Sequence, residues 1–181
     1  MRIISGKFGG RRFEVPKSGM RPTKDQVREA VFSSMAARVP AARVLDLFAG
    51  AGGYGLEALS RGAAHVTAVE KAPAHFKFLH ENFQQIAGDG SVDWKTVQAD
   101  VYDFLKSAVG VFNLIFADPP YDEADLPKLA ASAGGVLAPD GLLVFEMRST
   151  DAYSLPPELT LIKEKKYGES RVLFLEKTAN E

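Results

Sequence analysis

The stretch VLDLFAGAGGYG, residues 44–55, decides the fold of this chain. Its first five residues form a mostly apolar, β-rich run, and Gly50, Gly52 and Gly55 follow with the spacing GxGxxG. Glycines at these positions permit a tight turn and let the backbone approach a ligand closely. The stretch therefore predicts a strand that passes through a ligand-binding loop into a helix.

The alternation of strand and helix continues along the chain and predicts an α/β fold. Amphipathic stretches near 54–61, 73–87, 101–108 and 124–133 separate β-rich runs at 44–48, 65–70, 94–98, 112–118 and 141–147. Such a series indicates a Rossmann-like, doubly wound and mainly parallel sheet, which binds ligands at the carboxyl ends of its strands. Runs at 159–165 and 171–176 around Gly168 predict a C-terminal antiparallel hairpin at one sheet edge.

The amino-terminal region is basic, although the whole chain has a formal net charge of -1. Residues 1–28 hold eight basic and two acidic side chains, whereas the remainder holds 14 basic and 21 acidic ones. Short strands at 2–5 and 12–15 around Gly9-Gly10 predict an N-terminal β-hairpin arm over residues 1–22. Charge alone leaves two interpretations open, a polyanion-binding element or a solvated surface hairpin.

A helix should follow this arm and begin the core, residues 23–181. Thr23 and Gln26 have the spacing of a capping box, and apolar residues then recur at helical period to about residue 38.

Length and composition exclude several classes of protein. With 181 residues and 46% hydrophobic content, residues 1–181 should form a single domain. The absence of cysteine excludes disulfides and thiolate nucleophiles. No apolar run approaches the roughly 20 residues that cross a bilayer, so we expect a cytoplasmic protein with no membrane association. His65, His75 and His80 are interpreted as surface or strand-flanking residues, and no metal site is expected.

Acidic residues end successive predicted strands and indicate a nucleoside-containing cofactor. Glu70, twenty residues after Gly50, could accept hydrogen bonds from two ribose hydroxyls or could cap the next helix. Asp100 could receive an adenine amino group beside Val101, could cap the helix that starts there, or could do both. These acids suit NAD as well as S-adenosylmethionine. The expected cofactor-binding residues are Asp46, Phe48, Gly50, Gly52, Gly55, Glu70, Lys71, Asp100 and Val101.

The tetrapeptide Asp118-Pro119-Pro120-Tyr121 predicts the chemistry. Two consecutive prolines end a buried strand and make a rigid loop. The Asp118 carboxylate and the Pro119 carbonyl could accept both hydrogens of an amino group on an aromatic base, which turns the nitrogen lone pair toward a methyl donor, while Tyr121 stacks on the base. We therefore expect Asp118, Pro119, Pro120 and Tyr121 to be catalytic in direct, in-line methyl transfer from S-adenosylmethionine.

Several segments together resemble the RsmD family of bacterial 16S rRNA (guanine-N2)-methyltransferases. They are MRIISGK at 1–7, RPTKDQVREAVF at 21–32, DLFAG at 46–50, GLEALSRG at 55–62, DPPY at 118–121 and Tyr167-Gly168. The segment at 21–32 is the most specific. One departure is the loop Ala51-Gly52-Gly53-Tyr54, where the family pattern has a small polar residue and an Ala-Leu pair, and we expect Tyr54 to repack the methionine end of the cofactor site.

The resemblance implies a class I S-adenosylmethionine-dependent methyltransferase fold with S-adenosylmethionine as the methyl donor. It implies transfer to N2 of a guanine in 16S rRNA, presented by the small ribosomal subunit or its late precursor. Because a compact domain would have to dock on such a large particle, we expect a monomer. The arm would then bind RNA. The expected RNA-binding residues are Arg2, Lys7, Arg11, Arg12 and Arg21.

Three other functions remain as alternatives. A DNA adenine-N6 methyltransferase shares the DPPY motif but normally carries a sizeable target-recognition insertion, and no segment here is long enough for one. An NAD-dependent oxidoreductase fits the glycine loop and Glu70, but it leaves DPPY without a role and lacks a Tyr-x-x-x-Lys pair. A non-catalytic RNA-binding module explains the basic arm but not the acidic residues at the strand ends.

Overall fold

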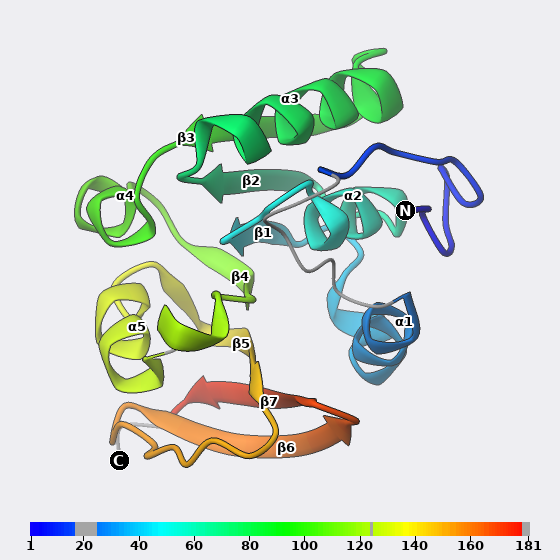
Figure 1. Cartoon of the computed structure of the whole chain (residues 1–181). Coiled ribbons are helices and arrows are strands. Elements are labelled where there is room, and N and C mark those ends of the chain that lie inside the picture. The colour runs from blue at the N-terminus through cyan, green and yellow to red at the C-terminus, as the bar shows by residue number, and fades with distance from the viewer. Residues whose placement is uncertain (17–24, 124, 179–181) are drawn as a thin grey trace.

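A mixed β-sheet forms the centre of the molecule (Figure 1). The computed structural model describes residues 1–16, 25–123 and 125–178. Within them the sheet has seven strands in the order β3-β2-β1-β4-β5-β7-β6. The strands are β1 (Arg43–Leu47), β2 (His65–Glu70), β3 (Asp93–Gln98), β4 (Phe112–Ala117), β5 (Leu137–Arg148), β6 (Leu159–Tyr167) and β7 (Ser170–Lys177).

The direction of winding reverses at β1. Strands β1 to β5 are parallel, with β2 on one side of β1 and β4 on the other, whereas β7 runs antiparallel to both β5 and β6. Parallel α/β sheets bind ligands where the winding reverses, at the carboxyl ends of the strands. The confirmed fold class, a Rossmann-like sheet with an antiparallel C-terminal hairpin, thus places a ligand site beyond the ends of β1 and β4.

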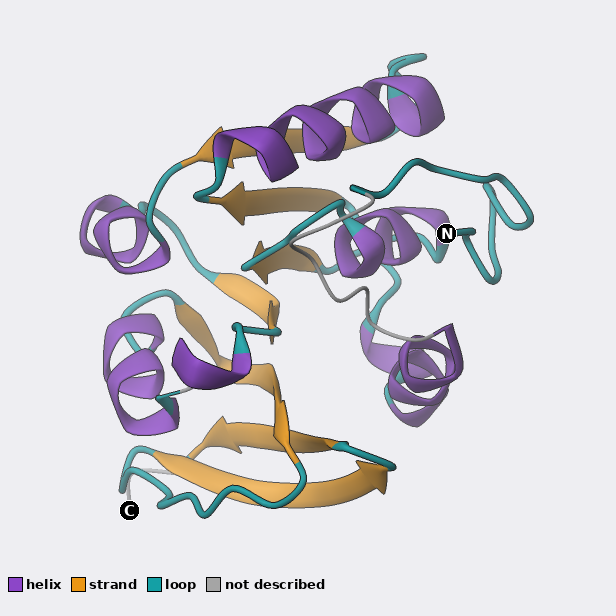
Figure 2. Ribbon diagram, in the orientation of Figure 1, coloured by secondary structure: helices purple, strands orange, loops and turns teal. Residues whose placement is uncertain are grey.

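Helices cover both faces of the sheet (Figure 2). Buried side chains of α1, α2 and α3 pack on one face, and those of α4 and α5 pack on the other. Neighbouring residues of a strand contribute to opposite faces, as Ile115 and Phe116 do in β4. The helices are α1 (Asp25–Ser34), α2 (Gly53–Ser60), α3 (Pro73–Ala87), α4 (Val101–Ser107) and α5 (Leu126–Ala133), with 3-10 turns η1 (Ala36–Arg38) and η2 (Tyr121–Glu123). Among the described residues, no helix is both long and apolar enough to span a membrane.

The expected helix at 24–38 and the strand at 141–147 differ from the structure in extent. The first helix ends at Ser34 and continues as the 3-10 turn η1, while the capping box at Thr23 lies outside the described residues. Strand β5 begins at Leu137, because Leu137 pairs with Phe112 before the register shifts to Leu114 and Leu142. The irregularity at 138–141 accounts for the turn-like sequence there.

The amino-terminal arm, residues 1–16, turns back on itself but packs against the core. Instead of two short strands, the structure has one antiparallel bridge between Arg2 and Arg12. The side chains of Ile3, Phe8 and Phe13 are buried in the same hydrophobic cluster as α1, α2 and α3. Burial of about 1.5–3 kcal/mol of apolar transfer free energy per such side chain holds the arm on the core.

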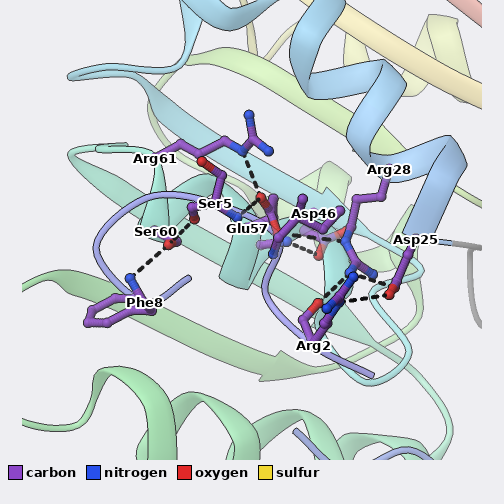
Figure 3. Close-up of polar contacts among 11 residues, drawn as sticks. Arg2, Ser5, Phe8, Asp25, Arg28, Asp46, Glu57, Ser60 and Arg61 are labelled. Atoms are coloured by element: carbon purple, nitrogen blue, oxygen red, sulfur yellow. Dashed lines mark hydrogen bonds and ion pairs between the residues drawn. The ribbon is translucent and has the colours of Figure 1, made fainter. Parts of the chain in front are cut away.

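Helix α2 also binds the arm through polar contacts (Figure 3). The Glu57 carboxylate accepts the backbone N–H groups of Ile4 at 2.7 Å and Ser5 at 3.1 Å, and the Arg61 guanidinium at 2.7 Å. The Ser60 hydroxyl accepts the N–H of Phe8 at 2.9 Å. Because backbone donors of the arm are satisfied by side chains of α2, the position of the arm is fixed over its first eight residues.

Arg28 lies under the arm and is fully buried. Its Nη2 donates to the Arg2 carbonyl at 2.5 Å and to Asp25 at 2.9 Å, and its Nε lies 3.8 Å from the Glu57 carboxylate. A buried guanidinium requires such compensation. Arg28, which belongs to the most family-specific segment, therefore joins α1, the arm and α2.

Asn82 of α3 connects the arm to the glycine loop. Its side-chain amide donates to the carbonyls of Glu14 at 2.8 Å and Ala51 at 2.9 Å, and its carbonyl accepts the N–H of Glu14 at 3.0 Å. Asn82 is buried, so these hydrogen bonds form away from solvent. One side chain thus holds the returning part of the arm and the loop after β1 at a fixed separation.

Candidate active site

A cavity of about 770 Å³ opens at the carboxyl ends of the parallel strands. Its volume lies within the range of roughly 300–1,000 Å³ usual for small-molecule sites. The residues from the sequence predictions that line it are Asp46, Phe48, Gly50, Glu70, Lys71, Asp100, Val101, Asp118, Pro119, Pro120 and Tyr121. The glycine loop and the DPPY tetrapeptide, 63 residues apart between Gly55 and Asp118 in the sequence, therefore face one cavity.

The glycine loop is held in a strained conformation. Phe48 has a φ of 58°, in the left-handed region that a bulky residue rarely adopts, and Gly50 and Gly52 follow at 55° and 93°. Two buried carboxylates hold the loop: Asp46 accepts the N–H of Gly55 at 2.8 Å, and Glu70 accepts the N–H of Gly50 at 2.9 Å. The loop is thus preorganised against the cavity.

Gly52 and Gly55, both expected to bind the cofactor, do not line the cavity. A Cβ on Gly52 would lie 2.7 Å from the Phe83 ring, and one on Gly55 would lie 2.9 Å from the same ring and 3.1 Å from the Asp46 carboxylate. These two glycines let α3 pack closely on the loop and on α2. Their role in the structure is helix packing, as for the third glycine of related nucleotide-binding loops.

Glu70 connects the ends of β1 and β2. Besides Gly50, it accepts the N–H of Ala72 at 2.8 Å, immediately before α3 begins at Pro73. Its carboxylate lines the cavity with 10% of the side chain exposed. Since a carboxylate can accept about four hydrogen bonds, the expected contact with ribose hydroxyls is compatible with both backbone contacts. His75, expected to be a surface residue, also lines the cavity, and its Nδ1 lies 3.9 Å from Glu70.

Asp100 caps helix α4 and lies on the cavity wall. It accepts the N–H of Tyr102 at 2.9 Å and the ammonium of Lys71 at 3.0 Å. The hydrogen bond from Lys71 is the main reason why the pKa of Asp100 lies below its ordinary value. Val101 is buried beside it and supplies an apolar patch. The capping interpretation of Asp100 is confirmed, and its contact with the cofactor stays a prediction.

Asp46 has a strongly perturbed acidity. Burial raises its pKa from 3.8 to about 7, against the opposing effect of the Gly55 hydrogen bond, and the nearby Glu70 carboxylate adds to the increase. A group poised between its two charge states at neutral pH is typical of a functional site. A cation bound beside Asp46 would stabilise its ionised form.

The DPPY tetrapeptide leaves β4 directly into the cavity wall. Asp118 follows the last residue of the strand, Pro119 is buried, and Tyr121 begins the turn η2. The Tyr121 hydroxyl lies 3.0 Å from the Ser170 hydroxyl, and the Arg148 guanidinium lies over the Tyr121 ring at 5.0 Å. The loop is therefore supported by β5 and β7 as well as by its two prolines.

Tyr54, expected to repack the methionine end of the cofactor site, lines the cavity, and so does Glu146, to which the sequence analysis gave no role. The Tyr54 hydroxyl donates to Glu146 at 3.2 Å, and its ring stacks on Phe116 with the centroids 4.8 Å apart. Burial raises the pKa of Tyr54 well above its ordinary value, and the carboxylates of Glu146, Asp118 and Asp46 raise it further. Tyr54 is thus a neutral hydrogen-bond donor among three acidic side chains.

The charge of the cavity favours a cationic ligand. Two cationic side chains, Lys71 and Arg148, line it among the described residues, against six carboxylates. A sulfonium or ammonium group would be attracted to such a site, especially where burial lowers the effective dielectric constant. The acidic residues are Asp46, Glu70, Asp100, Asp118, Asp122 and Glu146.

The described residues expected to bind RNA are exposed on the arm and do not line the cavity. They are Arg2, Lys7, Arg11 and Arg12, while Arg21 lies outside the described residues. The N–H of Lys7 bonds the Ser60 carbonyl at 2.7 Å, and the Arg11 guanidinium bonds the Ile86 carbonyl at 3.0 Å. Both contacts lie at the carboxyl-terminal ends of their helices, so Lys7 and Arg11 lie away from the cavity, whereas Met1 at the start of the arm lines it.

Known proteins share this arrangement along nearly the whole chain. A family model described as Conserved hypothetical protein 95 matches residues 1–176. Ribosomal RNA small subunit methyltransferase D of Escherichia coli K12 is 36% identical over 174 residues, 93% of this chain and 86% of that protein. The protein of the same name from Haemophilus influenzae is 34% identical, with 93% and 89% covered.

Two solved structures superpose on nearly the whole chain. The methyltransferase yhhF from Escherichia coli superposes with a TM-score of 0.87 at 32% identity, covering 99% of both chains. A Thermus protein, TTHA0928, superposes with a TM-score of 0.81 at 33% identity, covering 97% of this chain and 99% of its own.

Proposed function

Since the chain belongs to the RsmD family of ribosomal RNA methyltransferases, we propose that it methylates N2 of a guanine in the 16S rRNA of the small ribosomal subunit. The observation that carries the proposal is the common cavity of the glycine loop and Asp118–Tyr121. One motif supplies a cofactor site and the other supplies acceptors for an amino group. Neither the NAD-dependent oxidoreductase nor the RNA-binding module accounts for both.

The cofactor is S-adenosylmethionine, and the residues of the cavity fit it. The excess of carboxylates suits its cationic groups. Glu70 would accept hydrogen bonds from the ribose hydroxyls, Asp100 would accept one from the adenine amino group, and Asp46 would face the ammonium. Phe48, Lys71, Val101 and the backbone at Gly50 would complete the site. When bound, S-adenosylmethionine supplies an electrophilic methyl group.

The chain's own residues prepare the acceptor nitrogen. An exocyclic amino group of a base is a weak nucleophile because its lone pair is delocalised into the ring. The Asp118 carboxylate and the Pro119 carbonyl accept its two hydrogens, which favours a tetrahedral nitrogen with an available lone pair. Tyr121 stacks on the base, and Pro119 and Pro120 fix the direction of the loop. Catalysis then consists of positioning and exclusion of water, without a covalent intermediate.

The basic arm is the proposed RNA-docking surface. Arg2, Lys7, Arg11 and Arg12 are exposed on an arm that Glu57 and Ser60 fix to α2. Each cation that reaches a phosphate adds affinity by counterion release. A target base extruded into the cavity and a flanking helix on the arm would fit a large structured RNA, such as the small subunit or its late precursor.

Labelled methyl transfer tests the proposed function. S-adenosylmethionine with a labelled methyl group would be incubated with the enzyme and, separately, undermethylated small subunits, naked 16S RNA and DNA, followed by nucleoside analysis. The expected product is N2-methylguanosine from the small subunits. N6-methyladenosine from DNA would favour the DNA-methyltransferase alternative. Calorimetry should show binding of S-adenosylmethionine and none of NAD, and the reverse result would refute the methyltransferase mechanism.

A further inference from the structure

Asp118 and Glu146 lie on neighbouring strands at the same level of the sheet. Strands β4 and β5 are parallel and pair Phe116 with Val144 and Ala117 with Phe145. Asp118 directly follows the end of β4, and Glu146 is the next residue of β5. Both line the cavity, and both carboxylates raise the pKa of the same residue, Tyr54. Two acidic side chains therefore lie side by side on the cavity wall, at the level of the DPPY tetrapeptide.

Glu146 is built into this site. Its side chain is on the sheet face covered by α1 to α3, as are Val144 and Leu142 two and four residues earlier. It is 5% exposed, and the Tyr54 hydroxyl donates to its Oε2. The Tyr54 ring is itself fixed by stacking on Phe116. A buried carboxylate is tolerated only where polar partners compensate its desolvation, and Tyr54 provides one such partner at the cavity wall.

The hydrogen-bond pattern of the bases provides that function. Guanine carries the N1–H donor directly beside its exocyclic N2 amino group. Adenine and cytosine instead carry a ring-nitrogen acceptor beside their amino groups. A second carboxylate next to Asp118 could thus accept the N1–H of guanine. The same carboxylate would repel the lone pair of the ring nitrogen in adenine or cytosine. A site built to accept an N–H rejects an analogue that lacks it, by as much as about 10⁴-fold in known enzymes.

We propose that Glu146 is the residue that selects guanine, by accepting its N1–H while Asp118 and Pro119 accept the hydrogens of N2. Tyr54 is a positioning residue that holds the Glu146 carboxylate toward the base. This inference rests on the proposed function, because it assigns the specificity of the same reaction. It also gives a role to Tyr54, the residue at which the glycine loop departs from the family pattern.

A base analogue tests the assignment. 2-Aminopurine keeps the amino group on C2, but its N1 is an acceptor without hydrogen. Once the methylated guanine has been located, small subunits would be rebuilt around 16S RNA that carries guanine or 2-aminopurine at that position. The ratio of kcat/KM for the two substrates would be measured for the wild type, Glu146→Gln and Tyr54→Phe. Comparing this ratio between variants cancels the effect of the O6 atom that 2-aminopurine also lacks.

Glu146→Gln should still fold, but it should discriminate less between guanine and 2-aminopurine. Its amide keeps an acceptor for Tyr54 and gains a donor for N1 of 2-aminopurine, so the guanine preference should fall at least tenfold. Tyr54→Phe should lower the guanine preference less. Affinity for S-adenosylmethionine, measured by calorimetry, separates a weaker cofactor site from a loss of base selection, and Glu81→Gln on the exposed side of α3 is the control for removal of one carboxylate.

Two results would overturn the inference, and they are distinguishable. An unchanged preference in Glu146→Gln, with wild-type methylation of guanine intact, removes Glu146 from base selection but leaves the proposed function standing. Failure of the wild-type enzyme to form N2-methylguanosine on any acceptor would refute both the role of Glu146 and the proposed function.

Discussion

Asp46 accepts the backbone N–H of Gly55 at 2.8 Å from a fully buried position, and this one hydrogen bond joins the end of β1 to the first turn of α2. The same burial raises the pKa of Asp46 to about 7. The folded protein therefore holds a proton at pH values at which the unfolded chain has released it.

Asp46→Asn should change how stability depends on pH. Because the pKa of Asp46 rises from 3.8 to about 7 on folding, its contribution to stability is fully present below pH 3.8 and is lost as the pH rises through 7. Asparagine stays neutral. The free energy of unfolding of the variant, relative to wild type, should therefore be higher at pH 8 than at pH 5 in urea titrations. An equal difference at both pH values would contradict the raised pKa.

Asp118→Ala should abolish most of the methyl transfer while the cofactor affinity remains. Loss of one preorganised hydrogen-bond partner at a reacting group typically costs about 10²–10³ in kcat. Asp118→Asn keeps one oxygen acceptor and should lose less. Single-turnover methyl transfer gives the rate, and calorimetry with S-adenosylmethionine gives the affinity. Should Asp118→Ala remain fully active, the amino-group mechanism would be wrong.

Neutralising Arg11 and Arg12 should weaken RNA binding and reduce its salt dependence. Each lost phosphate contact lowers the slope of log K against log salt by roughly 0.7–0.9. Arg11→Gln with Arg12→Gln would be compared with Lys163→Gln with Lys166→Gln on β6, which removes the same charge from a strand at the far sheet edge. Filter binding to small subunits from low to high salt measures both slopes. Equal slopes for the two double variants would show that the arm is a structural element only.

Glu57→Gln should destabilise the fold through the arm. The carboxylate accepts two backbone N–H groups and balances the buried Arg28. Breaking a buried ion pair by removing one partner typically costs about 3–5 kcal/mol. Glu81→Gln removes an exposed pair with Lys77 and should cost less than about 1 kcal/mol. Urea unfolding compares the two variants, and similar midpoints would refute the anchoring role of Glu57.

Gly55→Ala should destabilise the junction of α2, α3 and the glycine loop. The added Cβ would lie 2.9 Å from the Phe83 ring and 3.1 Å from both Val66 and Asp46. Overpacking of this kind typically costs about 1–3 kcal/mol. Gly135→Ala is the matched control, since nothing lies within 4 Å of its added Cβ. The midpoints of thermal unfolding of the two variants would be compared. An unchanged midpoint for Gly55→Ala would mean that α3 can shift away from the loop.

Local patterns of the sequence predicted the fold well where one segment determines its own structure. Helix α3 begins and ends where expected, because Pro73 suits a first helical position and Leu79 and Phe83 form a buried stripe. The parallel strands follow from their apolar runs and from the helices between them. The arm was harder to predict, since the burial of Ile3 and Phe8 depends on α2 and α3, which lie far along the chain.

The candidate site was predicted in part for the same reason. Asp118, Glu70 and Asp100 are found at strand ends, a position that each local segment specifies. Tyr54 and Glu146 are 92 residues apart, and they meet only because β1, which leads into α2, and β5 pair with opposite sides of β4. The spacing of Gly52 and Gly55 predicted contacts with the cofactor. In the structure, the absence of a Cβ at both positions makes room for the Phe83 ring.

Asn82 couples the position of the arm to that of the glycine loop. Its amide bonds Glu14 of the arm and Ala51 of the loop from one buried side chain. A displacement of the arm that carried Asn82 with it would deprive the buried Ala51 carbonyl of this hydrogen bond, at a cost of about 1–3 kcal/mol. The position of the arm is thereby coupled to the conformation of the glycine loop at the cavity.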